Sequence, residues 1–215
     1  MENDTKLTKR EKWGLTIKTA VQAIPYVGGP LSTAIFDVQN ERKIKKLENY
    51  LNSLHTEFED YKEGHFIPKD EEEFAALVEN IFEQVKVEHK KEKIDYLRNF
   101  FKSAVKFDSA GLYDRQQSFL KALSEMDIIQ CQILQIMYDE DRKVLQGIFS
   151  EIATETEFDP YELVGAANRL ANLGFLKTYY KDVDFTNDEL ELSLNKTIEI
   201  SSLGKQFTEF CLKDQ

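Results

Sequence analysis

The sequence is poor in the residues that disulfide frameworks, metal sites and flexible linkers require. Its 215 residues include two cysteines, three histidines, nine glycines and four prolines. Two cysteines cannot build the disulfide framework of a small secreted domain, and their spacing suits no zinc site. Because Cys131 and Cys211 both lie in apolar periodic segments, we expect buried, reduced thiols. These features predict a cytoplasmic protein.

Signatures of catalysis and of nucleotide binding are also missing. The chain contains no G-x-S-x-G, no Walker A and no G-x-G-x-x-G pattern. Its acidic runs, DEEEF and YDEDRK, lie where helices are expected to begin or end, which is a usual place for solvated carboxylates. No histidine has metal-ligand spacing to a second histidine or to a cysteine. We therefore expect no catalytic residue, no metal and no cofactor, and hence a protein that is not an enzyme.

What the sequence does contain is enough apolar material for a core. Hydrophobic residues make up 41% of the chain, with 15 Phe and 9 Tyr, which is too apolar for a disordered protein. The net charge of −11 is spread unevenly. Residues 1–124 carry 20 Lys and Arg against 21 Asp and Glu, whereas residues 125–215 carry 8 against 18. Nearly all of the acidity therefore belongs to the C-terminal part.

Residues 1–123 are predicted to form a helical region of amphipathic helices. From Glu41 to Glu63, apolar residues recur at alternating steps of three and four. This stripe spans fewer than three heptads, which favours a helix packed in a bundle over a free coiled coil. It is also a candidate helix–helix interface for self-association, formed by Ile44, Leu47, Leu51, Leu54 and Phe58. A second helix is expected to begin after Asp70, which can act as its N-cap.

Residues 124–215 are predicted to form a winged helix-turn-helix with a small β-hairpin. The spacing of Ser124 to Asp127 resembles a capping box at the start of its first helix. Another helix has its signals in the expected order: Asp159 at the N-cap, Pro160 and Glu162 in the first turn, and Gly174 past the end. Residues 175–181 and 189–200 are expected to be strands, the second through alternating Leu190, Leu192 and Leu194. A last helix is expected to start at Ser201 or Ser202.

A winged helix commonly binds DNA, but the charge of this one argues against nucleic acid as a partner. A DNA-reading helix needs lysine and arginine to meet the phosphates. The basic residues available for that role are Arg169, Lys177, Lys181 and Lys196, set among many carboxylates. Because the summed field of this acidic region repels a duplex, we expect a protein partner or self-association. A DNA-binding transcription regulator is the alternative.

The run TAVQAIPYVGGPLSTAIF, Thr19 to Phe36, is the longest stretch without charge. Proline and the diglycine interrupt it, so a single spanning helix and a signal peptide are both disfavoured. We predict a tight corner between two short helices, with Ile24, Val27, Leu31 and Ile35 buried. The alternative is a membrane-docking tip between basic clusters, with contacts from Ile24, Pro25, Val27, Gly28, Gly29 and Pro30.

Two pairs of segments resemble a known family. One pair is IPYVGGPLS followed by ERKIKKLENYL, and the other is AANRLANLGFL with ISSLGKQFTEFCL. Together they resemble the bacterial Abi-alpha family, which is associated with abortive infection and phage defence. The resemblance implies a helical protein with a C-terminal winged helix and no family active site. The function expected is that of a non-enzymatic interaction protein in phage defence; an alternative is a peripheral membrane effector acting through residues 19–36.

Overall fold

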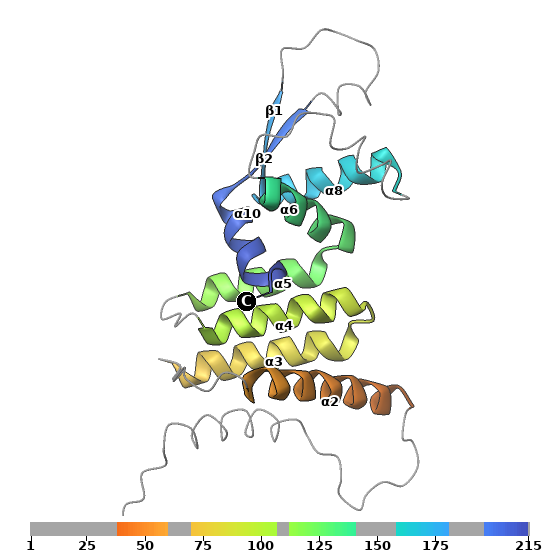
Figure 1. The fold of residues 1–215 in the computed structure, drawn as a ribbon, viewed down its shortest axis with the longest axis vertical. Helices are drawn as coiled ribbons and strands as arrows, with labels where there is room; N and C mark the ends of the chain where they lie inside the picture. Colours follow the sequence, from red (N-terminus) through yellow and green to blue (C-terminus); the bar gives the residue numbers. More distant parts are fainter. Residues whose placement is uncertain (1–37, 60–69, 107–111, 141–157, 181–195, 215) are drawn as a thin grey trace, which may run out of the picture. The chain divides into compact units, whose positions relative to one another are not determined.

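The computed structural model describes residues 38–59, 70–106, 112–140, 158–180 and 196–214. This part of the chain is mainly helical and has one small antiparallel sheet of two strands (Figure 1), as predicted at the level of fold class. The uncharged run of residues 19–36, with its predicted corner, lies outside the described residues. The helices are α2 (Val38–Glu59), α3 (Glu71–Val87), α4 (Lys91–Lys106), α5 (Tyr113–Glu125), α6 (Ile128–Glu140), α8 (Pro160–Asn172), α10 (Ser202–Phe207) and the π-helix η1 (Thr208–Leu212); the strands are β1 (Leu176–Tyr180) and β2 (Lys196–Ile200).

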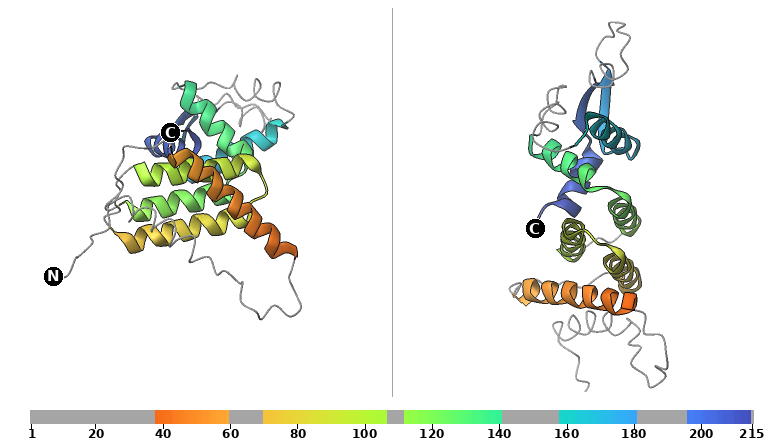
Figure 2. Two further views of the ribbon diagram at one scale, coloured as in Figure 1. Left: turned by 60° about the horizontal axis from the view of Figure 1, so that its bottom comes forward. Right: turned by 90° about the vertical axis from the view of Figure 1, so that its right-hand side faces the viewer.

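Helix α2 crosses the neighbouring α3 and α4 obliquely, and all three share one core (Figure 2). Its buried residues are Leu47, Tyr50 and Leu54, which recur at helical spacing on one face. The Tyr50 hydroxyl donates a hydrogen bond to the Leu97 carbonyl at 3.0 Å, and its ring meets the Phe82 ring edge-on at 6.3 Å between centroids. Tyr50 therefore links α2 to both neighbours. The buried residues that α3 and α4 supply include Leu77, Val78, Ile81, Phe82, Val85, Leu97, Phe100, Phe101 and Ala104.

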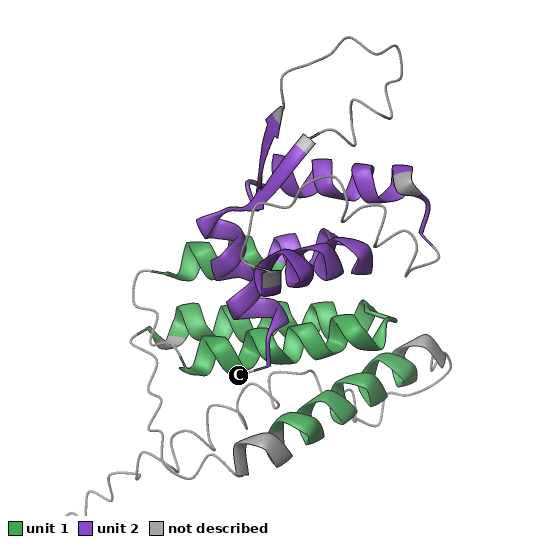
Figure 3. Ribbon diagram, turned by 45° about the horizontal axis from the view of Figure 1, so that its top comes forward, with its two compact units in different colours: residues 1–120 green, residues 121–215 purple. Residues whose placement is uncertain are grey.

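The chain divides into two compact units, Met1–Leu120 and Lys121–Gln215 (Figure 3). The division falls within α5, close to residue 124, where the sequence predicts that the helical region ends and the winged helix begins.

In the first unit the N-cap predicted for α3 is confirmed: the Asp70 carboxylate accepts hydrogen bonds from the N–H groups of Glu72 and Glu73 at 3.0 and 2.9 Å.

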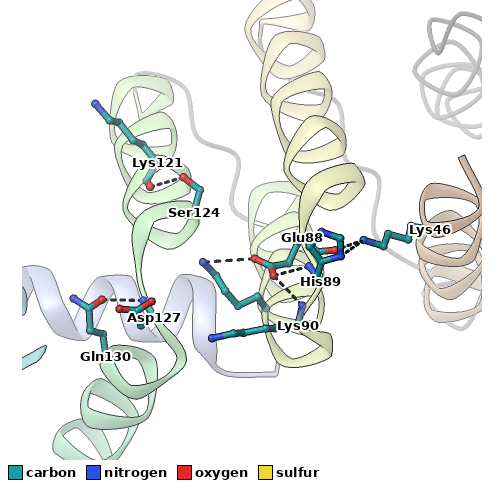
Figure 4. Close-up of polar contacts among 9 residues, drawn as sticks. Lys46, Glu88, His89, Lys90, Lys121, Ser124, Asp127 and Gln130 are labelled. Carbon is teal, nitrogen blue, oxygen red and sulfur yellow. Dashed lines mark hydrogen bonds and ion pairs between the residues drawn. The ribbon is translucent and has the colours of Figure 1, made fainter. Parts of the chain in front are cut away.

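The predicted capping box at Ser124 is wrong. Helix α5 continues to Glu125, and the Ser124 hydroxyl donates to the Lys121 carbonyl at 2.7 Å (Figure 4). The next helix is instead capped at Asp127, whose N–H donates to the Gln130 side chain at 2.8 Å and whose carbonyl accepts from the Gln130 N–H at 3.1 Å. The Gln130 side chain, at the third position of α6, thus accepts the Asp127 N–H, and the Ser124 hydroxyl bonds to a carbonyl of its own helix, α5.

The residues predicted to start and end α8 are confirmed in these roles. Asp159 and Glu162 form a capping box around Pro160, and Gly174 adopts a φ of 76°, a left-handed conformation that favours glycine. Strand β1 follows at once and pairs antiparallel with β2, with Leu176 opposite Ile200. The first predicted strand is therefore confirmed. The second predicted strand is present over its last five residues, and Leu190, Leu192 and Leu194 lie outside the described residues.

A close junction joins the end of α8 to the start of α10. Ser201 caps α10 as predicted, because its side-chain oxygen accepts from the Gly204 N–H at 2.9 Å. The same hydroxyl donates to the Gly174 carbonyl at 2.6 Å, and the Ser201 N–H donates to the Phe175 carbonyl at 2.9 Å. The Phe175 and Phe207 rings stack with centroids 4.5 Å apart. The two C-terminal segments on which the family resemblance rests are therefore in direct contact.

Both cysteines are buried free thiols, as predicted. Burial raises the pKa of the Cys211 thiol well above its ordinary value, and the neighbouring Cys131 adds to this effect. A thiol whose deprotonated form is disfavoured in this way is a weak nucleophile. Cys131 and Cys211 therefore act as small core residues on α6 and η1.

Candidate interaction surface

The predicted helix–helix stripe on α2 is largely used inside the first unit. Leu47 and Leu54 are buried, Leu51 is half-buried, and Ile44 is 46% exposed. Phe58 lies near the end of α2, and its side chain is outside the described part. The proposed membrane or partner contacts Ile24, Pro25, Val27, Gly28, Gly29 and Pro30 all precede the described residues.

The basic residues considered for DNA contact are only partly described. Arg169 and Lys177 are exposed on α8 and β1, Lys196 begins β2, and Lys181 falls outside the described ranges. The Arg169 guanidinium lies 3.2 Å from the Asp127 carboxylate, and both side chains are well exposed. An exposed pair of this kind adds little stability, but it places a negative charge directly beside the arginine.

The outer face of α8 is the most distinctive surface of the second unit. Leu163, Ala166 and Leu170 are buried on the inner face of the helix. On the other side, Tyr161, Gly165, Arg169 and Leu173 follow one another at four-residue spacing, so they lie along one ridge of the helix surface. Tyr161 is 64% exposed and Leu173 is 40% exposed. We call these four residues the α8 face.

Gly165 leaves the middle of the α8 face without a side chain. Among the residues that the structure describes, an added Cβ there would meet no heavy atom within 4 Å, so no packing against them requires glycine. A glycine inside a helix costs about 1 kcal/mol relative to alanine, because it loses more backbone freedom on folding. Its place between an exposed tyrosine and an exposed arginine leaves room for another molecule to approach the helix backbone.

A second exposed tyrosine lies on β1. Tyr179 is 41% exposed, and its hydroxyl donates to the Glu199 carboxylate at 3.1 Å across the hairpin. The hydrogen bond to Glu199 raises the pKa of Tyr179 above its ordinary value. A phenol that stays protonated near neutral pH cannot serve there as a general base, so this pair is a contact between the two strands of the hairpin.

A polar cluster forms where α3 turns into α4 (Figure 4). One Glu88 oxygen accepts from the N–H groups of His89 and Lys90 at 2.7 and 2.8 Å, and the other lies 3.7 Å from the buried Lys93 ammonium. Lys46 reaches over from α2, donating to the Glu88 carbonyl at 2.6 Å and lying 3.1 Å from His89 Nδ1. The cluster thus joins α2 to the α3–α4 turn, an association that spacing in the sequence does not indicate.

The Glu88 carboxylate should make stability depend on pH. Partial burial by itself raises the pKa of Glu88, but the N–H groups of Lys90 and His89 and the charges of Lys93 and Lys90 outweigh it, so the pKa lies below its ordinary 4.5. A lowered pKa stabilises the folded state above pH 4.5, and this stabilisation is lost as the pH falls through the folded-state pKa. We expect Glu88→Gln to lower the free energy of unfolding by about 1 kcal/mol at pH 7 and by much less near pH 3.

Urea unfolding at both pH values measures this difference. Glu92→Gln is the matched control, because Glu92 is an exposed residue one turn further along the chain. We expect that variant to stay within about 0.5 kcal/mol of the wild type at either pH. An equal loss for Glu88→Gln at pH 3 and pH 7 would contradict a role for the ionised carboxylate.

The described residues hold no group of three or more His, Cys, Asp or Glu side chains that could bind a metal ion. Of the helices in the described ranges, none combines the length and the apolar character that crossing a membrane requires. Compared with known protein families, with curated proteins and with solved structures, the chain shows no match. The resemblance to the Abi-alpha family therefore stays a prediction from the residues alone.

Proposed function

We propose that this chain is a non-enzymatic, cytoplasmic interaction protein of bacterial phage defence, and that it binds a protein partner through the α8 face. The observation that carries the proposal is Tyr161, a 64% exposed aromatic residue one helical turn from the open position at Gly165. Exposed tyrosines are enriched among binding hot spots, because the ring buries a large area at a small entropic cost. The phage-defence role is supported by the family resemblance.

We propose further that the second unit has winged-helix architecture. Helix α8 packs on α6, leads through Gly174 directly into β1, and is followed by an antiparallel β1–β2 hairpin. In that architecture α8 takes the place of the recognition helix and the hairpin takes the place of the wing. The α8 face is then the surface that other winged helices present to their ligands.

Charge favours a protein over DNA as the ligand of this surface. Residues 121–215 carry 9 Lys and Arg against 18 Asp and Glu, so the unit repels a polyanion. The α8 face itself offers one cation, Arg169, which is paired with Asp127. The complementary partner is a protein surface with basic residues around an apolar group that packs on Tyr161 and approaches the helix at Gly165.

Site-specific photo-crosslinking tests this proposal in bacteria. A crosslinking residue at position 161 should trap a discrete protein, and the purified partner should then bind the wild type at least about tenfold more tightly than Tyr161→Ser or Gly165→Glu. Tyr179→Ser is the matched control, because it removes an exposed tyrosine of the same unit that lies on β1 and is not part of the α8 face. Equal binding by all variants would contradict the proposed surface.

DNA binding is the outcome that would overturn the choice of ligand. A gel shift with genomic DNA fragments at low salt should show no complex. A complex that disappears with added salt and with Arg169→Ala would indicate a regulator instead. For the biological role, phage plating on cells that express wild type or Tyr161→Ser is the readout, and we expect protection with the wild type only.

A further inference from the structure

The exposed side of α8 carries a strip without charge along most of the helix. Tyr161, Gly165, Asn168 and Asn172 follow one another at steps of four, three and four residues, so they lie on one side of the helix. The buried residues of α8 lie on the opposite side: Leu163, Ala166, Ala167 and Leu170. Tyr161 and Asn172 are exposed, and the two residues between them are half-buried. We call these four residues the uncharged strip.

The charged residues of α8 are confined to one flank of the uncharged strip. Glu162 and Arg169 are seven residues apart, which places them on the same flank, and both are exposed. Asp127 of α6 lies beside Arg169, so this flank presents two carboxylates and one guanidinium. The other flank is formed by Val164 and Ala171, which are half-buried. A ligand on this side of α8 therefore meets an uncharged middle, one apolar flank and one flank of net negative charge.

We propose that the protein partner presents an α-helix, which lies along the uncharged strip. Two helices pack through residues spaced by three and four on each of them, and the side chains at the contact set how close their axes come. Gly165 allows a close approach, and the strip extends over about 16 Å of helix. An added β-strand would need a free strand edge, and a polyproline segment would need an aromatic-lined groove. The strip has no strand edge and a single aromatic residue, Tyr161.

The two flanks define the chemistry of the partner helix. Its edge over Val164 and Ala171 must be apolar, because water is excluded between the helices there. Its other edge must carry Lys or Arg, which meets the exposed carboxylates of Glu162 and Asp127. The partner is thus an amphipathic helix with one basic edge. Because the uncharged strip shares Tyr161 and Gly165 with the α8 face, this inference rests on the proposed function and specifies its partner.

Photo-crosslinking from several positions of the full chain tests this inference in bacteria. A benzophenone amino acid is placed at position 161, 164, 168 or 172, and mass spectrometry maps the residue that each position captures. We expect captured residues in one segment of one protein, spaced by three or four, with Lys or Arg along one edge of that segment. Position 75 is the matched control, because Ala75 is an exposed helix residue of the first unit. It should not capture the segment.

Gly165→Ala gives a readout that a purely structural role for the glycine would not produce. The added methyl group separates the two helix backbones, so the captured protein should bind about fivefold more weakly or worse. The free chain should nevertheless become more stable, because alanine favours the helix and its Cβ meets open space. Ser118→Ala is the matched control: it changes an exposed helix residue of the first unit to alanine and should leave binding unchanged.

Failure of this inference is distinguishable from failure of the proposed function. If no position of α8 captures a protein, both are overturned. If one protein is captured through a strand or an irregular loop, the α8 face stands and the helix is overturned. Capture of a second copy of this chain would assign the strip to self-association instead. Full binding by Gly165→Ala would show that no backbone comes close to α8 at this position.

Discussion

Replacing Gly204 with alanine is expected to destabilise the second unit by about 3 kcal/mol or more. An added Cβ would lie 2.2 Å from the Phe175 carbonyl oxygen and 3.0 Å from a side-chain carbon of Ile200. The carbonyl cannot rotate away, because it accepts the Ser201 N–H that begins the α10 cap. Relief of the clash therefore requires α10 to move off the end of α8.

Gly165→Ala is the matched control for this change. The same substitution in the same unit meets open space and removes a mid-helix glycine, so we expect it to raise the free energy of unfolding by about 0.5–1 kcal/mol. Urea denaturation followed by circular dichroism measures both variants. Unchanged stability for Gly204→Ala would show that the close approach of α10 to Phe175 does not exist in solution.

Signals that act within one helical turn could be predicted from the sequence. The caps at Asp70 and Asp159 and the glycine at position 174 are correctly predicted, because each satisfies backbone groups two or three residues away. The wrong prediction at Ser124 also concerns hydrogen bonds that act within one helical turn. Two capping patterns compete there, and the reciprocal bonds between Asp127 and Gln130 prevail over the serine hydroxyl.

Features that depend on tertiary contact could not be predicted in this way. Lys46 and His89 are 43 residues apart, and nothing in the spacing of either segment shows that they meet. The need for glycine at position 204 likewise depends on a carbonyl 29 residues earlier in the chain. The place of Tyr161 beside Gly165 could have been predicted, because the two residues are four apart on a helix whose ends the sequence defines, and that spacing puts them on one helix face.

The second large effect is expected at Tyr50. Its side chain is 2% exposed, lies against Phe82 and donates a hydrogen bond to the Leu97 carbonyl, so it packs α2 onto α3 and α4 at once. Tyr50→Ala should therefore lower the free energy of unfolding by about 3–5 kcal/mol. Tyr50→Phe keeps the ring and removes only the hydroxyl, so it should cost about 1 kcal/mol.

The same pair of variants distinguishes a core role for α2 from a role between copies of the chain. If the stripe packs within the monomer together with the buried Tyr50, the denaturation midpoint of the wild type should not change over a hundredfold range of protein concentration. Sedimentation velocity should also give the same oligomeric state for wild type and Tyr50→Phe. A midpoint that rises with concentration, and that loses this dependence in Tyr50→Ala, would instead assign the stripe to self-association, because only a contact between chains couples stability to mass action.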